Sequence, residues 1–368
     1  MPTIQAGSPT KIGLELGHTS YTVLVGSGLL DEAAQLCLDE TGLRPKRVAI
    51  VTDSTVGPLY AERVTGSFTA AGIEPTLIEV PAGEASKSME QATEICREML
   101  RAGLDRKSLL VALGGGVVGD LAGFAAAIFQ RGIPCLQIPT TVVSQVDSSV
   151  GGKTGVNTPE GKNLIGAFHQ PRLVVADTET LATLPDREFN EGFAEIIKHA
   201  AIRDASLLDL VEDRPTIRES LPELMTRNIE IKAAVVEEDE RETSGTRALL
   251  NFGHTIGHGI EAAGGYGRFL HGEAISLGLV AAARLSVEHD SLRAEEADRL
   301  IAALAAYELP TRLPEDIETE SILAAMTRDK KFEHGQIRFV LLPRLGQAHL
   351  VSTIDRGSII DAIAQLRE

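Results

Sequence analysis

The chain of 368 residues has few cysteines, no long apolar run and a shortage of positive charge. Its three cysteines, Cys37, Cys96 and Cys135, form no CxxC pair, which argues against both a disulfide framework and a cysteine-ligated metal. No apolar run reaches the ~18 residues that cross a bilayer. The first residues, MPTIQAGSPTK, lack the basic region and apolar core of a signal peptide. These absences predict a cytoplasmic protein with no membrane partner.

The charge balance also excludes a class of partner. A net charge of -17 argues against nucleic acid, because binding a phosphate polymer requires a basic surface. One stretch is nonetheless mildly basic, with Arg131, Lys153 and Lys162 against Asp147 and Glu160. A small anionic substrate therefore remains compatible with the sequence.

The first part of the chain alternates short apolar segments with helical patterns. The segments expected to be strands are 21–26, 47–53, 76–81, 108–115, 134–139 and 172–177. They are apolar throughout, which is typical of strands buried on both faces, whereas 88–103 has apolar residues at helical spacing. This alternation predicts an α/β fold with βαβ units and a mostly parallel, Rossmann-like sheet covered by helices.

The pattern changes near residue 180. From there it is helical almost without interruption, apart from segments at 337–343 and 348–352 that predict a hairpin. Internal repeats are absent. We therefore expect two domains, an α/β domain over 1–178 and a mainly α-helical domain over 179–368.

The clearest glycine motif is LGGGVVGD at 113–120, in which Gly114, Gly116 and Gly119 satisfy GxGxxG. It follows an expected strand and opens an expected helix, where backbone N–H groups can face a phosphate. It does not follow the first strand, and no acidic residue lies about 20 residues further on. The ribose-binding role could instead fall to Asp53. Nucleotide binding and a merely tight turn both stay open on this pattern.

Polar groups gather in two later segments. PTTVVSQVDSSVGGKTGVN (139–157) and GKNLIGAFHQP (161–171) are rich in glycine and polar side chains, which predicts loops or strand ends. The candidate binding residues there are Thr140, Thr141, Asp147, Ser148, Ser149, Lys153, Thr154, Asn157, Lys162 and Asn163. The lysines suit a phosphate or carboxylate. A solvated polar loop is the alternative.

Three of the nine histidines fall in HTIGHGIEAAGGYGRFLHGE, residues 254–273. His254 and His258 share a helix face, but a threonine follows His254 where a helical zinc protease has its glutamate. The GGYG run must end the helix that we expect to begin at Leu249, so His271 starts another one. Nitrogen and oxygen ligands without thiolate suit a cation such as zinc. Separate surface or core histidines are the alternative.

A second helical segment, NEGFAEIIKHA, adds Glu195, Lys198 and His199 on one flank. An exposed i,i+4 ion-pair face is the simpler interpretation. Apolar neighbours such as Phe193 and Ile197 indicate that this helix is largely packed. A buried carboxylate beside a lysine is then a candidate functional group.

Taken together, these segments resemble the 3-dehydroquinate synthase family of sugar-phosphate cyclases. The resemblance is carried by LGGGVVGDLAGFAAAIFQRGI, QIPTTVVSQVDSSVGGKTGVN, GKNLIGAFHQP, EGFAEIIKHA and LLNFGHTIGHGIEA followed by LHGE. It implies a dehydroquinate synthase-like fold, with NAD bound by the domain at 1–178 and metal and substrate by the domain at 179–368. It also implies a homodimer in which Arg131 reaches the partner's site.

The resemblance further implies which residues bind each group. Zinc or cobalt would be held by Glu195, His254 and His271. NAD would contact Asp53, Ala82, Gly83, Glu84, Ala85, Ser86, Lys87, Gly116, Val117, Val118, Gly119, Asp120, Thr140, Thr141, Lys153, Lys162, Thr180, Leu181, Ala182 and Thr183. The substrate would meet Arg131, Asp147, Lys153, Asn163, Lys198, Lys232, Arg247, Asn251, His258 and one of Lys330 and Lys331.

The implied reaction converts 3-deoxy-D-arabino-heptulosonate 7-phosphate (DAHP) to 3-dehydroquinate and phosphate. Transient oxidation of the C5 hydroxyl by NAD acidifies the neighbouring C–H, so phosphate can leave; the hydride then returns and the ring reopens and closes by an aldol step. The segment DERETSGTRALL reads one residue longer than the family pattern. Arg247 still stands four residues before Asn251 and is kept as a carboxylate binder.

Three other functions compete with this interpretation. A sister cyclase would act on a different sugar phosphate. A glycerol-type dehydrogenase that uses metal and NAD would need a hydride acceptor in solution, and would not need Lys153, Lys162, Lys232 and Arg247. A non-catalytic NAD sensor would have no use for a metal ligand set beside a hydride site.

Overall fold

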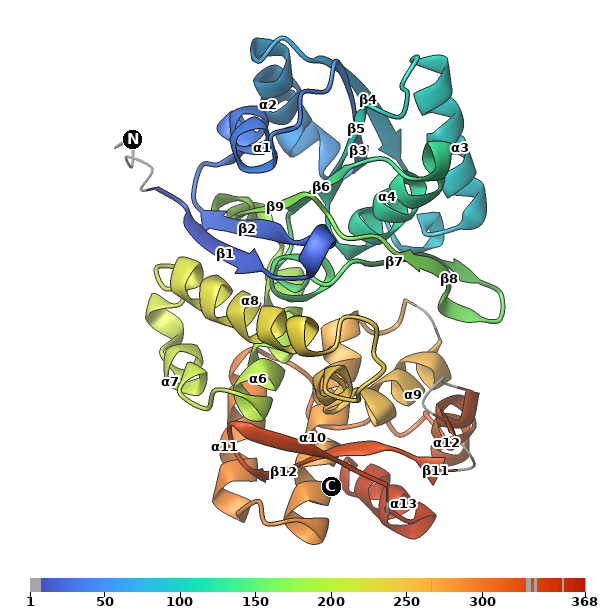
Figure 1. Cartoon of the computed structure of the whole chain (residues 1–368). Helices are drawn as coiled ribbons and strands as arrows, with labels where there is room; N and C mark the ends of the chain where they lie inside the picture. Colours follow the sequence, from blue (N-terminus) through green and yellow to red (C-terminus); the bar gives the residue numbers. More distant parts are fainter. Residues whose placement is uncertain (1–7, 266, 329–331, 334–335, 353, 368) are drawn as a thin grey trace. The chain divides into compact units, whose positions relative to one another are not determined.

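The computed structural model describes residues 8–265, 267–328, 332–333, 336–352 and 354–367. The chain divides into two compact units, residues 1–184 and 185–368 (Figure 1). Among the described residues, no helix combines the length and the apolar character needed to cross a bilayer. The assignment of one unit to NAD and of the other to metal and substrate stays a prediction.

The first unit is built on a seven-stranded sheet with the order β1-β2-β9-β6-β5-β3-β4. Its strands are β1 (Thr10–Leu14), β2 (Tyr21–Gly26), β3 (Arg47–Asp53), β4 (Glu74–Val80), β5 (Leu109–Gly114), β6 (Cys135–Pro139) and β9 (Leu173–Asp177), and β7 (Lys153–Thr158) and β8 (Gly161–Phe168) form a separate pair. Its helices are α1 (Ala33–Thr41), α2 (Gly57–Ala70), α3 (Met89–Arg101) and α4 (Gly116–Ile128). Its short 3-10 or π turns are η1 (Gly17–Thr19), η2 (Leu30–Glu32), η3 (Glu84–Ser86), η4 (Phe129–Arg131), η5 (Ser144–Ser148) and η6 (Thr178–Thr183).

The sheet is parallel from β2 to β4, as the apolar strands predict, and only β1 is antiparallel. Successive residues of β3 face opposite sides: Ile50 joins the apolar cluster that includes α1 and α2, and Val51 joins the one that includes α3 and α4. Helices thus cover both faces (Figure 1). Because the central strands bury both faces, they carry almost no polar residues.

Two features of this unit differ from the expectation. β1 lies in the N-terminal segment, where no strand is predicted, and pairs with β2 as an amphipathic edge strand. The two polar glycine-rich segments were expected to be loops or strand ends, but parts of them form the antiparallel hairpin β7–β8. Glycine makes this pairing close, because a Cβ on Gly166 would lie 2.2 Å from the carbonyl oxygen of Thr154. Low apolar content had concealed the strands.

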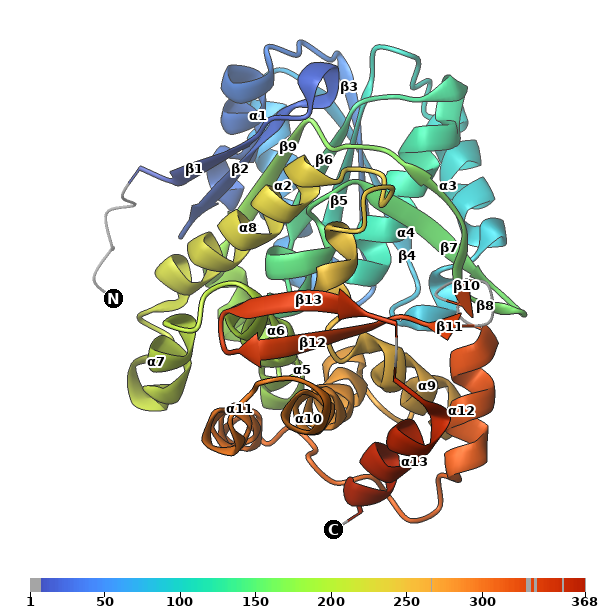
Figure 2. The same ribbon diagram turned by 60° about the horizontal axis from the view of Figure 1, so that its bottom comes forward.

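The second unit is mainly helical, as expected. Its helices are α5 (Asp186–Glu191), α6 (Phe193–Ile202), α7 (Leu207–Glu212), α8 (Leu221–Glu238), α9 (His254–Gly264), α10 (His271–His289), α11 (Ala294–Ala306), α12 (Thr319–Arg328) and α13 (Arg356–Gln365), with the short turns η7 (Arg214–Thr216) and η8 (Arg247–Asn251). Its strands are β10 (Phe332–Glu333), β11 (Gln336–Ile337), β12 (Phe339–Arg344) and β13 (Gln347–Val351). The predicted hairpin is β12–β13, which packs beside α10 (Figure 2).

The predicted helix start at Leu249 is wrong. Leu249 lies in the 3-10 turn η8, and α9 begins only at His254. The break lies at Gly253, which has a left-handed φ of 77° that an L side chain rarely adopts. The prediction that His271 starts a helix is confirmed by α10. His254 and His271 are therefore each the first residue of a helix.

Candidate functional site

Glu195 is a fully buried carboxylate on α6, a helix whose residues are all buried. Lys198, one turn further on and 1% exposed, donates a hydrogen bond to Glu195 Oε2. The other oxygen, Oε1, is buried and has no hydrogen-bond partner among the described residues. A buried carboxylate oxygen without a donor costs stability unless something positive faces it.

Two imidazoles face that oxygen. His254 Nε2 lies 3.3 Å and His271 Nε2 3.4 Å from Glu195 Oε1. His254 Nδ1 lies 3.1 Å from the carbonyl oxygen of Phe252. Since a carbonyl only accepts, Nδ1 carries the proton and Nε2 presents a lone pair to the site. Ligand atoms of these three residues lie within 4.8 Å of one another.

The charge states of His254 and Glu195 suit a cation, whereas His271 holds a proton in the absence of one. Burial lowers the pKa of His254 to about 3, which keeps this ring neutral, as a metal ligand must be. Burial opposes ionisation of Glu195, but the neighbouring Lys198 charge holds the pKa of that carboxyl well below its usual range. Burial likewise opposes the charge on His271, but the nearby carboxylates of Glu195 and Glu261 raise its pKa to about 10. His271 must lose that proton before its Nε2 can ligate a metal.

A second set of ligand atoms lies alongside the first. His258, Glu261 and His271 also have ligand atoms within 4.8 Å of one another, and the His258 ring centroid lies 5.2 Å from that of His254 and 6.0 Å from that of His271. Both sets share His271. The first set contains the buried Glu195 Oε1 without a hydrogen-bond partner and the fixed tautomer of His254, with separations of 3.3 and 3.4 Å. In the second set the atoms lie further apart, since His271 Nδ1 is 4.0 Å from Glu261 Oε2. The geometry favours Glu195, His254 and His271 as the ligands.

Glycine contacts bring the two helix starts together. A Cβ on Gly278 of α10 would lie 2.0 Å from the carbonyl oxygen of Gly253, immediately before α9. A Cβ on Gly272 would lie 1.9 Å from the carbonyl oxygen of Glu191, whose side chain accepts a hydrogen bond from the Gly272 amide at 2.7 Å. Close backbone contact of this kind lets His254 and His271 approach the same carboxylate.

The second unit also contains several of the predicted substrate residues. Lys232 lies on α8 and is 5% exposed, Arg247 begins η8 and is 2% exposed, and Asn251 ends η8. α8 and η8 contact each other, so these residues come from adjoining elements. Lys330 and Lys331, the remaining candidates in this unit, lie outside the described residues.

In the first unit, the glycine motif lies at the point where the strand order reverses. After β3 the chain proceeds to β4 on one side, and β5 then returns to the other side of β3 and leads on to β6 and β9. The register that pairs Val51 with Ala112 carries Asp53 and Gly114 to the same end. Open α/β sheets bind ligands in the crevice at such a point. α4 begins there at Gly116, as the motif predicts.

The glycines of the motif also have a packing role. A Cβ on Gly114 would lie 2.7 Å from Val118 Cβ, and one on Gly119 would lie 3.0 Å from Gln137 Oε1. A Cβ on Gly116 would meet the side chain of Ser148, with the hydroxyl oxygen at 3.1 Å and Cβ at 3.6 Å. Close packing thus accounts for these glycines, and nucleotide binding at the start of α4 stays a prediction.

The segment Ala82–Lys87 meets the same motif. Lys87, 6% exposed, forms an ion pair with Asp120 of α4. Glu84 Oε1 accepts a hydrogen bond from Asn157 Nδ2 at 2.8 Å and lies 3.9 Å from Lys162 Nζ. Predicted cofactor residues from three separate sequence segments are therefore adjacent.

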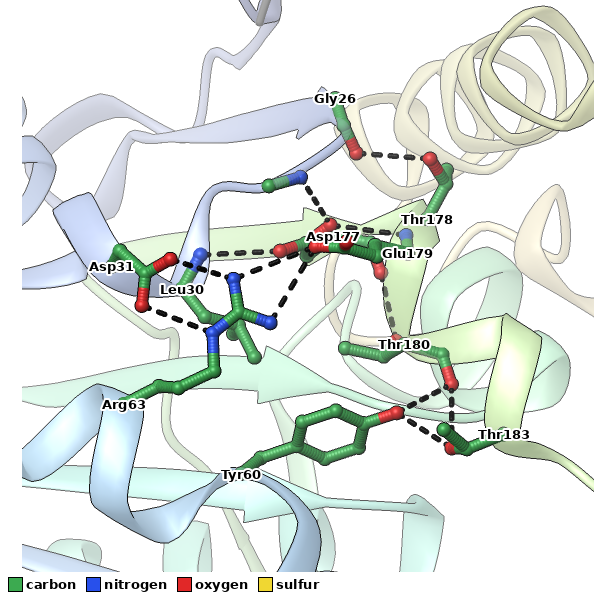
Figure 3. A network of polar contacts seen from close by, with 11 residues as sticks. Gly26, Leu30, Asp31, Tyr60, Arg63, Asp177, Thr178, Glu179, Thr180 and Thr183 are labelled. Atoms are coloured by element: carbon green, nitrogen blue, oxygen red, sulfur yellow. Dashed lines mark hydrogen bonds and ion pairs between the residues drawn. The ribbon is translucent and has the colours of Figure 1, made fainter. Parts of the chain in front are cut away.

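The η6 turn, which holds the predicted residues Thr180 to Thr183, is fixed by a polar network (Figure 3). Tyr60 of α2 donates to the Thr180 carbonyl at 3.1 Å and bonds the Thr183 hydroxyl at 2.5 Å. Asp177, fully buried, accepts backbone N–H groups of Gly28, Glu179 and Leu30 at 2.9, 3.0 and 3.1 Å. The network joins η6 to α2 and to the end of β2.

Replacing Asp177 with asparagine tests this network. In Asp177→Asn one oxygen still accepts two N–H groups, but an NH₂ donor faces the Leu30 amide. We expect a loss of about 1–3 kcal/mol in the free energy of unfolding. Urea unfolding measures it. Glu179→Gln, at a side chain 51% exposed, is the control and should change it by about 1 kcal/mol or less; equal effects would contradict a special role for Asp177.

Other predicted residues of the first unit are more dispersed. Arg131 is exposed on η4 with φ 70°, Asp147 lies half-buried in η5, and Lys153 begins β7. Asn163 has a left-handed φ of 56° and donates its amide to Asn157 Oδ1 at 3.0 Å. Buried Thr140 donates its amide to the Gly114 carbonyl, which places the start of this loop beside the glycine motif.

Sequence reasoning missed several residues that the structure places in these groups. Glu261 lies three residues after His258 on the same helix and shares a set of ligand atoms with it. This i,i+3 spacing is visible in the sequence HTIGHGIE and could have identified Glu261. Asp177 and Tyr60 had no local signal, because their partners are distant in sequence.

Comparisons with known proteins agree with this arrangement. Sequence models described as 3-dehydroquinate synthase N-terminal and C-terminal match residues 77–191 and 192–332. The 3-dehydroquinate synthase of Geobacter metallireducens is 48% identical over 351 residues, which cover 94% of this chain and 96% of that protein.

Two solved structures share the fold over nearly the whole chain. The 2-epi-5-epi-valiolone synthase of Streptomyces hygroscopicus, with NAD+ and Zn2+ bound, has a TM-score of 0.87 at 30% identity and covers 95% of this chain and 98% of its own. A 2-deoxy-scyllo-inosose synthase complexed with carbaglucose-6-phosphate, NAD+ and Co2+ has a TM-score of 0.85 at 25% identity, with 97% and 99% covered. Given the matches to both family models and to the Geobacter relative, the chain belongs to the 3-dehydroquinate synthase family.

Proposed function

We propose that this protein converts DAHP to 3-dehydroquinate and phosphate, with NAD and a divalent metal, zinc or cobalt, as cofactors. The observation that carries the proposal is the bare buried oxygen of Glu195 facing His254 and His271, with Lys198 on the other oxygen of the same carboxylate. Relatives of the family bear this activity in their names, among them one at 48% identity.

Glu195, His254 and His271 would hold the metal, and the end of the sheet near Asp53 and the start of α4 would hold NAD. When bound, NAD would supply reversible hydride transfer at C5, and the metal would supply a Lewis acid for the hydroxyl oxygen. No net oxidation results, because one hydride leaves and one returns. The buried carboxylate thus supplies the negative charge that a cation requires in a site without thiolates.

The cationic side chains would bind the two anionic ends of the substrate. Arg247 is suited to the carboxylate, since its planar guanidinium can donate two parallel hydrogen bonds. Lys198 and Lys232 are nearly buried, so a charge–charge contact there is less screened than at the surface. Lys153, Asn163 and His258 are assigned to substrate as well. Fixing both ends holds the reacting carbons in one geometry for elimination and ring closure.

The homodimer, the reach of Arg131 into the partner's site and the cytoplasmic location also belong to the proposal. Arg131 is exposed, so its side chain is accessible to a second copy. Leu164, Ile165 and Phe168 on β8 are 42%, 41% and 46% exposed, and exposed apolar side chains that lie together commonly pack against another chain. These observations support a dimer that uses the β7–β8 hairpin.

A sister cyclase is the strongest second candidate, because both solved structures named above are cyclases with other products. Their identities of 30% and 25% fall well below the 48% of the dehydroquinate synthase from Geobacter. A glycerol dehydrogenase also has a related fold, at a TM-score of 0.59 and 17% identity, which shows the fold alone.

One assay separates these functions. The purified protein is incubated with DAHP, catalytic NAD and zinc or cobalt, and phosphate release and dehydroquinate formation are followed. We expect both products in equal amounts with no lasting NADH. An absence of phosphate release would contradict the proposal. NADH that accumulates with glycerol-like substrates would favour the dehydrogenase, and turnover only of other sugar phosphates would favour a sister cyclase.

A further inference from the structure

Asp239 follows the last residue of α8 and is only 4% exposed. Its carboxylate accepts four backbone N–H groups: Oδ1 from Thr243 at 2.7 Å and Ser244 at 3.1 Å, and Oδ2 from Gly245 at 3.0 Å and Arg247 at 3.2 Å. Converging backbone N–H groups form a cradle for an anion. Here the anion is the side chain of Asp239 itself, which directly precedes the loop. Its hydrogen bonds to these four amides close residues 240–246 into a ring.

The ring contains backbone that would not hold its shape unaided. Glu242 and Gly245 have left-handed φ values of 58° and 93°, and a non-glycine residue keeps such a conformation only where its surroundings impose it. Burial opposes the charge of Asp239, but the amides of Ser244, Arg247 and Thr243 lower its pKa to about 2. The carboxylate is therefore ionised across the neutral range, and its four bonds are charge-assisted.

Arg247 is tied to this ring at both its backbone and its side chain. Its amide is one of the four donors to Asp239. Its Nη1 donates to the carbonyl oxygen of Glu240, the residue after Asp239, and its Nε lies 3.9 Å from Glu242 Oε1. The guanidinium is thus oriented by groups whose positions Asp239 determines.

We propose that Asp239 is the positioning residue for Arg247, holding loop 240–246 so that the guanidinium faces the carboxylate of the substrate. This inference rests on the proposed function, in which Arg247 is the carboxylate binder. Asp239 acts on the loop and only through Arg247 on substrate. Loss of the carboxylate should therefore weaken substrate binding more than it slows the chemical steps.

A double-mutant cycle tests the inference. Asp239→Asn keeps the size of the side chain but replaces one acceptor oxygen with a donor. We expect KM for DAHP to rise about 10- to 100-fold, as for misplacement of a binding group by about 1 Å, with kcat less affected. In an Arg247→Ala background the same change should alter kcat/KM by less than about twofold, because residues that act through one another are not additive. An equal factor in both backgrounds would overturn the proposal.

Thr243→Ala is the matched control, since this residue keeps its backbone donor and its side chain is exposed. It should leave KM unchanged. Hydrogen exchange at the amides of Thr243, Ser244, Gly245 and Arg247 should be faster in Asp239→Asn than in the wild type, and unchanged in Thr243→Ala. This expectation holds whichever reaction the protein catalyses. Unchanged exchange in Asp239→Asn would also overturn the role of Asp239.

Two provisions keep the test decisive. If Asp239→Asn does not fold, Asp239→Glu, which retains the charge on a longer side chain, goes through the same cycle. A wild-type protein that does not release phosphate from DAHP would contradict the proposed function. It would not contradict the role of Asp239 in holding the loop, because the exchange measurement is independent of substrate. The two failures are thereby distinguished.

Discussion

His271→Ala and His254→Ala are expected to lose bound metal, whereas His258→Ala is expected to keep it and lose turnover. The first two substitutions each remove an imidazole whose Nε2 lies 3.3–3.4 Å from Glu195 Oε1. Loss of a residue that only hydrogen-bonds to a metal ligand lowers metal affinity roughly 10–100-fold. Loss of a ligand itself should lower the metal affinity by more than this. Metal content after dialysis, measured by inductively coupled plasma mass spectrometry, reports the difference.

The His254→Ala and His258→Ala pair separates the two ligand sets that share His271. If His258, Glu261 and His271 held the metal, His254→Ala would retain it and His258→Ala would lose it. His289→Ala, at the far end of α10, is the control, and its metal content should match the wild type. Equal metal loss in His254→Ala and His258→Ala would contradict the assignment of different roles to these histidines.

Gly278→Ala is expected to destabilise the second unit and to weaken metal binding together. The new Cβ would lie 2.0 Å from the Gly253 carbonyl oxygen and 2.7 Å from the Gly257 amide nitrogen. Because both obstacles are backbone atoms, only separation of α9 from α10 relieves the clash. Overpacking of this kind costs about 1–3 kcal/mol or more. Urea unfolding, with a chelator and then with added zinc, measures both effects.

Gly66→Ala in α2 is the matched control for that substitution. Apart from the neighbouring backbone of the helix, no heavy atom of the described residues lies within 4 Å of the position that a Cβ on Gly66 would take. It should therefore stabilise the protein by about 0.4–1 kcal/mol, because alanine restricts the unfolded chain and favours the helix. A Gly278→Ala variant as stable as the wild type would show that the helices can separate without cost.

Part of the fold was predictable because its chemistry is local. β2 and β3 occupy the predicted residues, 21–26 and 47–53. A strand buried on both faces must be apolar along its whole length, and that signal is independent of the neighbouring strands. The start of α10 at His271 was similarly signalled by the glycines before it.

Other parts were not predictable from local patterns. β7 and β8 mix glycine, polar and apolar residues, so neither regular alternation nor a long apolar run marks them, and their pairing is visible only when both strands are present. The start of α9 depends on a left-handed Gly253 that packs against α10. Contacts between distant segments override local preference at both places.

The residue types in the sequence, with the family resemblance, determined the candidate chemistry: histidines and a glutamate for a metal without thiolates, a glycine motif for a nucleotide, and lysines and arginines for an anion. Only the tertiary structure decided how those groups combine. It places one bare oxygen of Glu195 opposite two imidazoles on different helices, and it uses four amides on Asp239 to hold Arg247. Sequence spacing specifies neighbours along one helix face, but convergence from separate helices depends on how closely their backbones pack.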